Sequence, residues 1–209
     1  MILAIDTSAG QCAVAFGEQT RTERLSRGHG EILMPMIDEV TGGSLARLTA
    51  IAVCTGPGSF TGLRIGIAAA RGLALGCGVP AIGISRFEAL AAGRTARVIL
   101  RGRGEIRHVQ SFIDGQPTQA PEVQSGAPAP GWVGVLEGST RADLDGEARG
   151  LLILGDGAPS ASEIDGLPDP RIIARLAAER LPGPPPAPLY LRPADAAPPR
   201  DAPPRLLDA

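Results

Sequence analysis

A glycine-rich turn between an apolar segment and a helical one constrains this chain more than any other feature. The string GPGSFTGLRIG, from Gly56 to Gly66, follows the apolar run 50–54 and opens a helix predicted to continue to about Leu75. Backbone N–H groups and the positive end of a helix dipole meet at such a turn, so it can bind an anion. It is not a standard nucleotide loop, because Leu63 stands where ATPases need Lys, and all twenty basic residues are Arg.

Small residues recur on the helix that follows the turn. Gly62, Gly66 and Ala70 are four residues apart and therefore share one face. A glycine inside a helix costs about 1 kcal/mol relative to alanine, so this face indicates a close approach to another backbone. The residues alone favour packing inside the chain and packing against a partner chain equally.

Length and charge exclude several classes of protein. With 209 residues and a net charge of −2, the chain can bury a core and lacks the basic surface of a free-standing nucleic-acid binder. Its first residues lack the basic start and long apolar stretch of a signal peptide, so none is expected. Arg64 and Arg71 interrupt the longest apolar run, so no membrane span is expected either. Three cysteines in apolar surroundings are expected to be reduced, buried thiols of a cytoplasmic protein: Cys12, Cys54 and Cys77.

Strand and helix patterns alternate after an opening hairpin, which predicts a mixed α/β lobe. Strands are expected at 2–5, 12–16, 21–25, 50–54 and 81–84, and helices at 31–40, 59–75 and 87–92. Beyond residue 94 the pattern is weaker, with strands expected at 98–100, 106–113, 132–136 and 151–154 and a helix at 172–181. Half of the twenty prolines follow Leu181, where only the segment 189–192 is expected to pack.

Few side chains suit catalysis. The two histidines, His29 and His108, are far apart, which excludes a short-spaced metal pair, and His29 is expected on the surface or at a helix cap. No nucleophile elbow is present, and Ser59 is expected to cap a helix. Asp6 ends the first strand, where it either forms an Asx-turn or holds water or a metal near a phosphate. The residues alone favour the turn.

Three strings together resemble a known family. ILAIDTSAGQCAVAF resembles the first hairpin of the actin, Hsp70 and sugar-kinase superfamily, while HGEILMPMIDEV and CTGPGSFTGLRIGIAAARGLALG are similar to the bacterial TsaB (YeaZ) family. PLYLR resembles that family's C-terminal end. The resemblance implies an α/β fold with an actin/Hsp70-like (ribonuclease H-like) lobe at 1–94 that carries a partner interface. A smaller, degenerate second lobe is expected at 95–190, and a proline-rich tail without fixed structure at 191–209.

The resemblance also implies a function. TsaB is the non-catalytic dimerisation subunit of the tRNA threonylcarbamoyladenosine complex. It pairs with a metal- and ATP-binding paralogue that modifies the adenosine beside the anticodon, an ATPase subunit joins the complex, and this subunit meets tRNA only indirectly. The implied interface candidates lie on two helices, and half of the apolar set is expected to face the chain's own core: Ile32, Leu33, Met36, Ile37, Gly62, Gly66 and Ala70.

Nucleotide binding is the weaker implication. The residues that match the superfamily's phosphate-binding hairpin are Asp6, Thr7 and Ser8, so no tightly bound cofactor is expected, and ATP or ADP belongs at most to the complex interface. The main alternative is a small ATP-hydrolysing or phosphoryl-transfer enzyme of the same superfamily, whose turnover would depend on Asp6. A protease has almost no support. The helix face is also a candidate for homodimerisation when the partner is absent, and direct tRNA contact would use tail arginines: Arg192, Arg200 and Arg205.

Overall fold

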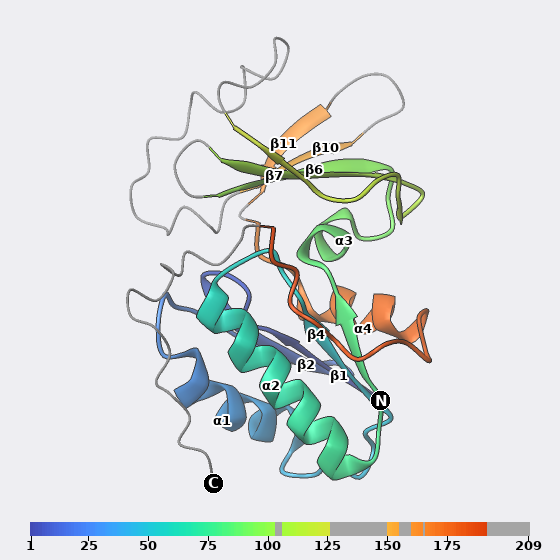
Figure 1. The fold of residues 1–209 in the computed structure, drawn as a ribbon. Coiled ribbons are helices and arrows are strands. Elements are labelled where there is room, and N and C mark those ends of the chain that lie inside the picture. Colours follow the sequence, from blue (N-terminus) through green and yellow to red (C-terminus); the bar gives the residue numbers. More distant parts are fainter. Residues whose placement is uncertain (103–105, 126–149, 155–159, 165, 192–209) are drawn as a thin grey trace, which may run out of the picture.

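Two β-sheets, joined by a short helix, organise the chain (Figure 1). The computed structural model describes residues 1–102, 106–125, 150–154, 160–164 and 166–191. The predicted strand 132–136 and the tail beyond residue 191 lie outside these residues. Mixed sheets and helices confirm the predicted α/β class.

The first sheet has the strand order β3-β2-β1-β4-β5. Its strands are β1 (Ile2–Asp6), β2 (Gln11–Phe16), β3 (Gln19–Arg24), β4 (Ala50–Cys54) and β5 (Ala81–Ile84). The first three form an antiparallel meander, and β4 and β5 run parallel to β1. The sheet therefore changes from antiparallel to parallel at β1, and β1 lies at its centre.

Alternating side chains divide the core of this sheet into two layers. Leu3 and Ile5 point into a cluster that α1 (His29–Thr41) and α2 (Phe60–Cys77) cover, whereas Ala4 points into a cluster on the opposite face. That opposite face is lined largely by alanines of β1, β2 and β4, and it receives α4 (Pro170–Ala178) through Ile173 and Ala177. Small side chains on a sheet let a helix approach closely, so α4, although distant in sequence, can pack directly on these alanines.

The second sheet is antiparallel, with the order β11-β10-β6-β7-β8 and with β9 also paired to β7. Its strands are β6 (Ala96–Arg101), β7 (Arg107–Ile113), β8 (Gln116–Pro117), β9 (Glu122–Gln124), β10 (Gly150–Leu154) and β11 (Ser160–Ile164). α3 (Arg86–Ala91) connects β5 to this sheet, and Phe87 and Ala91 pack against the apolar side chains of β6 and β7.

Several boundaries differ from the sequence predictions. α1 begins at His29, two residues before the predicted start, so Pro35 lies past the first turn. β8, β9 and β11 were not predicted, because two or three residues carry no readable alternation and SASEI lacks an apolar face. α4 belongs by sequence to the predicted second lobe, 95–190, but its apolar face packs on the first sheet. The division of the chain into lobes at residue 94 stays a prediction.

The thiol of Cys77 does not follow its prediction. Cys12 and Cys54 are buried as expected, whereas Cys77 is exposed at the last residue of α2. The neighbours of Cys77 in sequence are apolar or small, but Leu75, Gly76 and Gly78 are exposed as well, so this end of α2 lies on the surface. By length and apolar composition α2 alone, among the described helices, could cross a bilayer; core helices of globular proteins meet the same test, and α2 packs on β4.

Candidate protein-docking site

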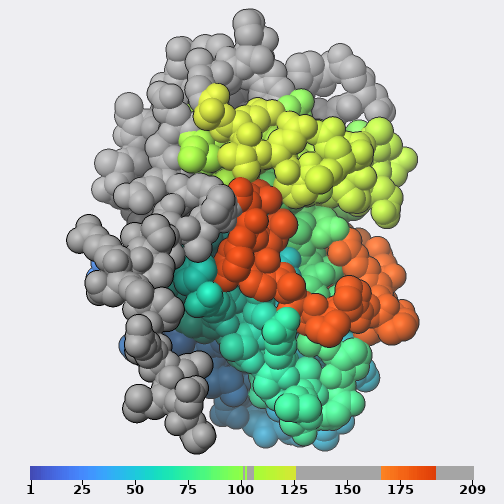
Figure 2. Space-filling view, viewed as in Figure 1, coloured from blue at the N-terminus to red at the C-terminus, as the bar shows by residue number. Residues whose placement is uncertain are grey.

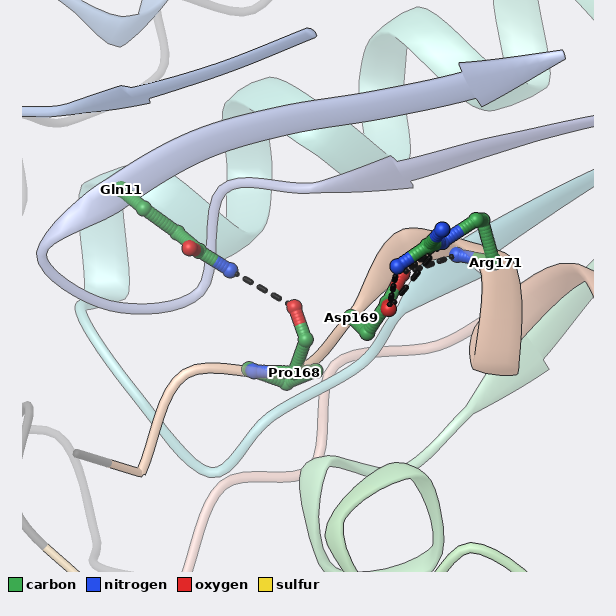
Figure 3. A network of polar contacts seen from close by, with 4 residues as sticks. All are labelled: Gln11, Pro168, Asp169 and Arg171. Carbon is green, nitrogen blue, oxygen red and sulfur yellow. Dashed lines mark hydrogen bonds and ion pairs between the residues drawn. The ribbon is translucent and has the colours of Figure 1, made fainter. Parts of the chain in front are cut away.

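The turn between β1 and β2 is held by its own side chains. The Ser8 amide donates to Asp6 Oδ1 (2.9 Å), which is the Asx-turn arrangement, and Gln11 Nε2 donates to Asp6 Oδ2 (2.7 Å). The same Gln11 amide donates to the Pro168 carbonyl (2.9 Å), so the turn is tied to the chain just before α4 (Figure 3). Asp6 is fully buried. Both of its carboxylate oxygens therefore serve the fold.

The glycine-rich turn lies directly on this β1–β2 turn. The Ser59 amide donates to the Ser8 carbonyl (2.7 Å), and Thr7 Oγ1 donates to the Gly62 carbonyl (2.8 Å). A Cβ atom at Gly58 would overlap the Ser8 carbonyl, and one at Gly62 would overlap the Thr7 carbonyl. Ser59 caps α2 as predicted, accepting from the Gly62 amide (3.3 Å). The predicted close approach is thus a contact inside the chain.

Most of the predicted interface residues are consequently buried in the chain's own core. Gly66 meets the Thr7 side chain, and Ala70 packs in the cluster between the first sheet and the two helices. Leu33, Met36 and Ile37 belong to that same cluster, because they line the apolar stripe of an amphipathic helix that rests on the sheet. These residues and Gly62 are therefore corrected to core positions. Ile32 alone of the seven stays half-buried.

The opposite face of α2 is exposed, and its small and apolar residues share it with Arg64 and Arg71. Leu75 is 86% exposed, and Ala68, Gly72 and Gly76 are exposed at four-residue spacing. Within the described part of the chain, a Cβ atom at Gly72 or at Gly76 would meet nothing within 4 Å. No contact among the described residues explains these two glycines, in contrast to the glycines that pack on Thr7 and Ser8. Sequence analysis missed this second small-residue face, although its spacing is the same.

A proline-rich segment borders this face on one side. We call residues 182–191 the C-terminal strap; in Figure 2 it lies between the surface of α2 and that of the second sheet. The Arg71 side chain donates to the Pro186 carbonyl (2.6 Å), and the Leu189 amide donates to the Thr55 carbonyl (2.8 Å). Leu189 and Leu191 pack on the core of the second sheet. The strap therefore contacts α2 and the second sheet at once.

The other side of the face is bordered by α1. Ile65 of α2 lies 3.8 Å from the position that a Cβ atom on Gly30 would take. On the surface of α1, Met34 is an apolar residue that is 47% exposed. The exposed polar residues of this helix are all acidic: Glu31, Asp38 and Glu39. The outward face of α2 is thus a ridge between an acidic helix and an uncharged strap.

A buried arginine fixes the glycine-rich turn from behind. Arg86 is 2% exposed; its amide donates to the Gly56 carbonyl (2.7 Å) and its Nη1 to the Pro57 carbonyl (3.2 Å). Its Nε donates to the Gly166 carbonyl (2.7 Å), close to the start of α4. The Arg86 guanidinium thus donates hydrogen bonds both to the glycine-rich turn and to the segment before α4. These bonds position the turn relative to α4.

The two buried thiols near this turn, Cys12 and Cys54, are unreactive near neutral pH. Burial, and then the nearby carboxylate of Asp6, raise the pKa of Cys12 to about 12. The same two causes raise the pKa of the Cys54 thiol, which lies 3.4 Å from Ser8 Oγ, well above its usual range. A thiol is nucleophilic only as the thiolate, so neither cysteine acts as a nucleophile near neutral pH.

Metal ligands do not gather in the described part of the chain. No group of three or more His, Cys, Asp or Glu side chains that could hold a metal ion occurs there. His29 was expected on the surface or at a cap; it is the first residue of α1, it is buried, and its Nε2 lies 3.1 Å from the Ala9 carbonyl. His29 therefore supports the β1–β2 turn, and His108 lies on β7 of the second sheet.

Comparisons with known proteins agree with this fold. A family model for TsaD, the tRNA N6-adenosine threonylcarbamoyltransferase, matches residues 20–105. Two solved structures from Pseudomonas aeruginosa superpose on 91% of this chain and 99% of their own: one titled YeaZ (TM-score 0.67, 23% identity) and one titled as an uncharacterized protein similar to peptidase YeaZ (TM-score 0.66, 25% identity). The two sheets and their helices define an α/β protein whose fold is similar to that of the YeaZ structures.

Curated relatives narrow this class. The chain is 42% identical over 99 residues to the tRNA threonylcarbamoyladenosine biosynthesis protein TsaB of Escherichia coli, an alignment that covers 44% of this chain and 43% of that protein. It is 44% identical over 97 residues to the protein of that name from Haemophilus influenzae, covering 43% and 41%. The chain thus spans less than half the length of these relatives. Together the comparisons confirm the predicted resemblance to the TsaB (YeaZ) family.

Proposed function

We propose that this chain is a non-catalytic subunit in the synthesis of threonylcarbamoyladenosine on tRNA and that it docks on the catalytic paralogue through the outward face of α2. The observation that carries the proposal is the contrast between two sets of glycines on one helix. Gly62 and Gly66 pack on the chain's own β1–β2 turn, whereas a Cβ atom at Gly72 or Gly76 would meet none of the described residues outside its own helix within 4 Å. Each exposed glycine costs the helix about 1 kcal/mol, which close packing of a partner helix would offset.

The proposed partner follows from the relatives. The curated proteins that this chain matches are named for threonylcarbamoyladenosine biosynthesis, and other matches, at 35% and 32% identity, are named tRNA N6-adenosine threonylcarbamoyltransferases. A paralogue of the same fold presents an equivalent pair of helices, so the two chains would pack helix against helix. In the proposed complex an ATPase subunit joins this pair, and this chain meets tRNA only indirectly, in the cytoplasm.

The phosphoryl-transfer enzyme remains the second candidate, and the β1–β2 turn argues against it. A phosphate-bound metal or water needs an accessible carboxylate, whereas Asp6 is fully buried and both its oxygens accept hydrogen bonds. Thr7 and Ser8 are buried as well, beneath the glycine-rich turn. We therefore propose that this turn alone holds no nucleotide and that ATP or ADP, where it is bound, belongs to the complex interface.

Co-purification with the genome's catalytic paralogue tests the docking proposal. Ala68→Glu and Gly72→Leu, on the outward face of α2, are expected to abolish a heterodimer that the wild-type chain forms. Ala178→Glu is the matched control, because Ala178 is also an exposed helical residue but lies on α4, across the first sheet. The readout is size-exclusion chromatography with light scattering. Pairing by both face variants, or no pairing by the wild type, would refute the proposal.

Self-association is a measurable alternative on the same face. When the partner is absent, two copies could bury their α2 ridges against each other, giving a homodimer that the same two substitutions would dissociate. Light scattering of the lone chain distinguishes the two states. ATP turnover by the lone chain, compared with that of Asp6→Ala, is the corresponding test of the enzyme alternative, and the expected result is no turnover in either.

A further inference from the structure

Two aromatic rings and an arginine form a cluster where α2 meets the C-terminal strap. The rings of Phe60 and Tyr190 stack with their centroids 5.4 Å apart and their planes at 29°. The Arg64 guanidinium carbon lies 3.8 Å from the Phe60 ring centroid, and Arg64 Nε donates to the Tyr190 hydroxyl (3.3 Å). Each of the three side chains thus contacts the other two.

The cluster is held in place yet exposed to solvent. Phe60 is 49% exposed and Tyr190 is 44% exposed. The chain has six aromatic residues, and these two are placed on the surface and not in a core. An arginine normally loses side-chain entropy when it is fixed at an interface, but stacking on Phe60 and bonding to Tyr190 fix Arg64 before any partner arrives. Ordered Phe, Tyr and Arg side chains are the residues that most often dominate binding energy at protein interfaces.

The two described segments that build the cluster carry charges of one sign. α2 carries Arg64 and Arg71 and no acidic residue, and the strap carries no charge at all. The acidic residues of α1 border the opposite side of the α2 ridge. A surface of this kind is complementary to carboxylates that approach from the strap side.

The cluster also continues the proposed docking face. Phe60, Arg64, Ala68 and Gly72 follow one another at four-residue spacing, so they form one row along α2. A partner helix that packs on Ala68 and Gly72 would therefore reach Arg64 one turn further along and Tyr190 beside it.

We propose that the Phe60–Arg64–Tyr190 cluster is a second anchor of the docking surface and that it receives an acidic segment of the partner protein. This inference rests on the proposed function, because the partner is the same paralogue chain. The anchor adds the C-terminal strap to the interface, and it places carboxylates of the partner opposite Arg64.

A binding titration with the paralogue tests the anchor. Tyr190→Ala and Arg64→Gln are each expected to weaken binding at least about tenfold, the effect of losing an interface anchor. Arg64→Gln should also reduce the dependence of affinity on salt, because a charge pair is lost. Tyr190→Phe keeps the stacked ring and should bind within about threefold of wild type. Arg171→Gln on α4 is the matched control, with the expected affinity of the wild type. Thermal unfolding of each variant checks that the chain still folds.

The outcomes separate this inference from the proposed function. Loss of pairing in Ala68→Glu together with wild-type affinity in Tyr190→Ala and Arg64→Gln would overturn the anchor and leave the docking face standing. No pairing by the wild type would refute the proposed function itself. An anticodon stem-loop RNA is titrated in parallel. Binding of that RNA by the wild type and loss of it in Arg64→Gln, with protein pairing unchanged, would reassign the cluster to RNA and overturn the inference.

Discussion

Thr7 and Gly62 lie in contact across two turns that are far apart in sequence. The Thr7 hydroxyl donates to the Gly62 carbonyl (2.8 Å), and a Cβ atom on Gly62 would overlap the Thr7 carbonyl oxygen. The start of α2 therefore rests on the β1–β2 turn with no room for a side chain. This contact separates the glycines that the fold requires from those that it does not.

The first prediction compares two glycines of α2. Gly62→Ala is expected to lower the free energy of unfolding by about 2 kcal/mol, because the strain of overpacking exceeds the gain in helix propensity. Gly72→Ala is expected to raise it by up to about 1 kcal/mol, since the added Cβ atom would meet none of the residues that the structure describes. Urea unfolding of the monomeric chain, followed by circular dichroism, measures both. Equal effects of the two substitutions would contradict the assignment of the two faces.

The second prediction concerns Asp6. Asp6→Ala leaves the Ser8 amide and the Gln11 side chain without their buried acceptor, so the free energy of unfolding is expected to fall by about 2–4 kcal/mol. The variant should show the same absence of ATP binding as the wild type in isothermal calorimetry. Binding of ATP by the wild-type chain that disappears in the variant would show that the carboxylate serves a ligand and not only the turn.

The third prediction concerns the thiols. A disulfide reagent at pH 8 is expected to label one cysteine per folded chain, the exposed Cys77, and three after unfolding. The pKa of Cys12 is raised from 9.0 to about 12 in the folded chain. Its contribution to stability is therefore complete below pH 9 and is lost as the pH rises towards 12. Cys12→Ala should unfold with a weaker dependence on pH in that window. Rapid labelling of two or more thiols in the folded chain would contradict the burial.

The fourth prediction concerns the capping box of α3. The Ser85 hydroxyl accepts from the Glu88 amide (3.1 Å), and Glu88 Oε2 accepts from the Ser85 amide (2.9 Å). Burial opposes ionisation of Glu88, but hydrogen bonds from Arg180 and Ser85 outweigh it and lower its pKa below 4.5. Stability from Glu88 is therefore present above pH 4.5 and is lost as the pH falls through the lower, folded-state value.

Ser85→Ala is expected to cost about 1 kcal/mol at neutral pH, the usual effect of losing an N-cap. Glu88→Gln should flatten the dependence of unfolding free energy on pH below 4.5. Acid titrations of the two variants and the wild type, read as urea midpoints, measure both effects. An unchanged acid profile in Glu88→Gln would show that Arg180 does not stabilise the charged form.

Local patterns predicted much of this fold, since a strand, a glycine turn and a capped helix are each decided by neighbouring residues. The Gly62–Gly66–Ala70 spacing predicted a close approach but could not name the backbone approached, because that choice depends on Thr7, more than fifty residues away. Cys77 was misplaced because apolar neighbours in sequence do not guarantee burial: Leu75 beside it is itself 86% exposed. The exposed face of α2 has the same four-residue spacing of small residues as the buried one, so the spacing alone could not tell them apart. What distinguishes the exposed face is that a Cβ atom at Gly72 or Gly76 would meet none of the described residues within 4 Å.

The packing of α4 on the first sheet has a consequence for how the chain folds during its synthesis. Ala4 and Ala52 leave the ribosome long before the helix that covers them, because α4 is complete only at Ala178. Until then one face of the first sheet lacks its cover, and the second sheet is translated in the interval. A nascent chain that stops near residue 94 would therefore present a bare apolar sheet to chaperones and proteases, and the N-terminal half cannot be expected to accumulate as a stable fragment.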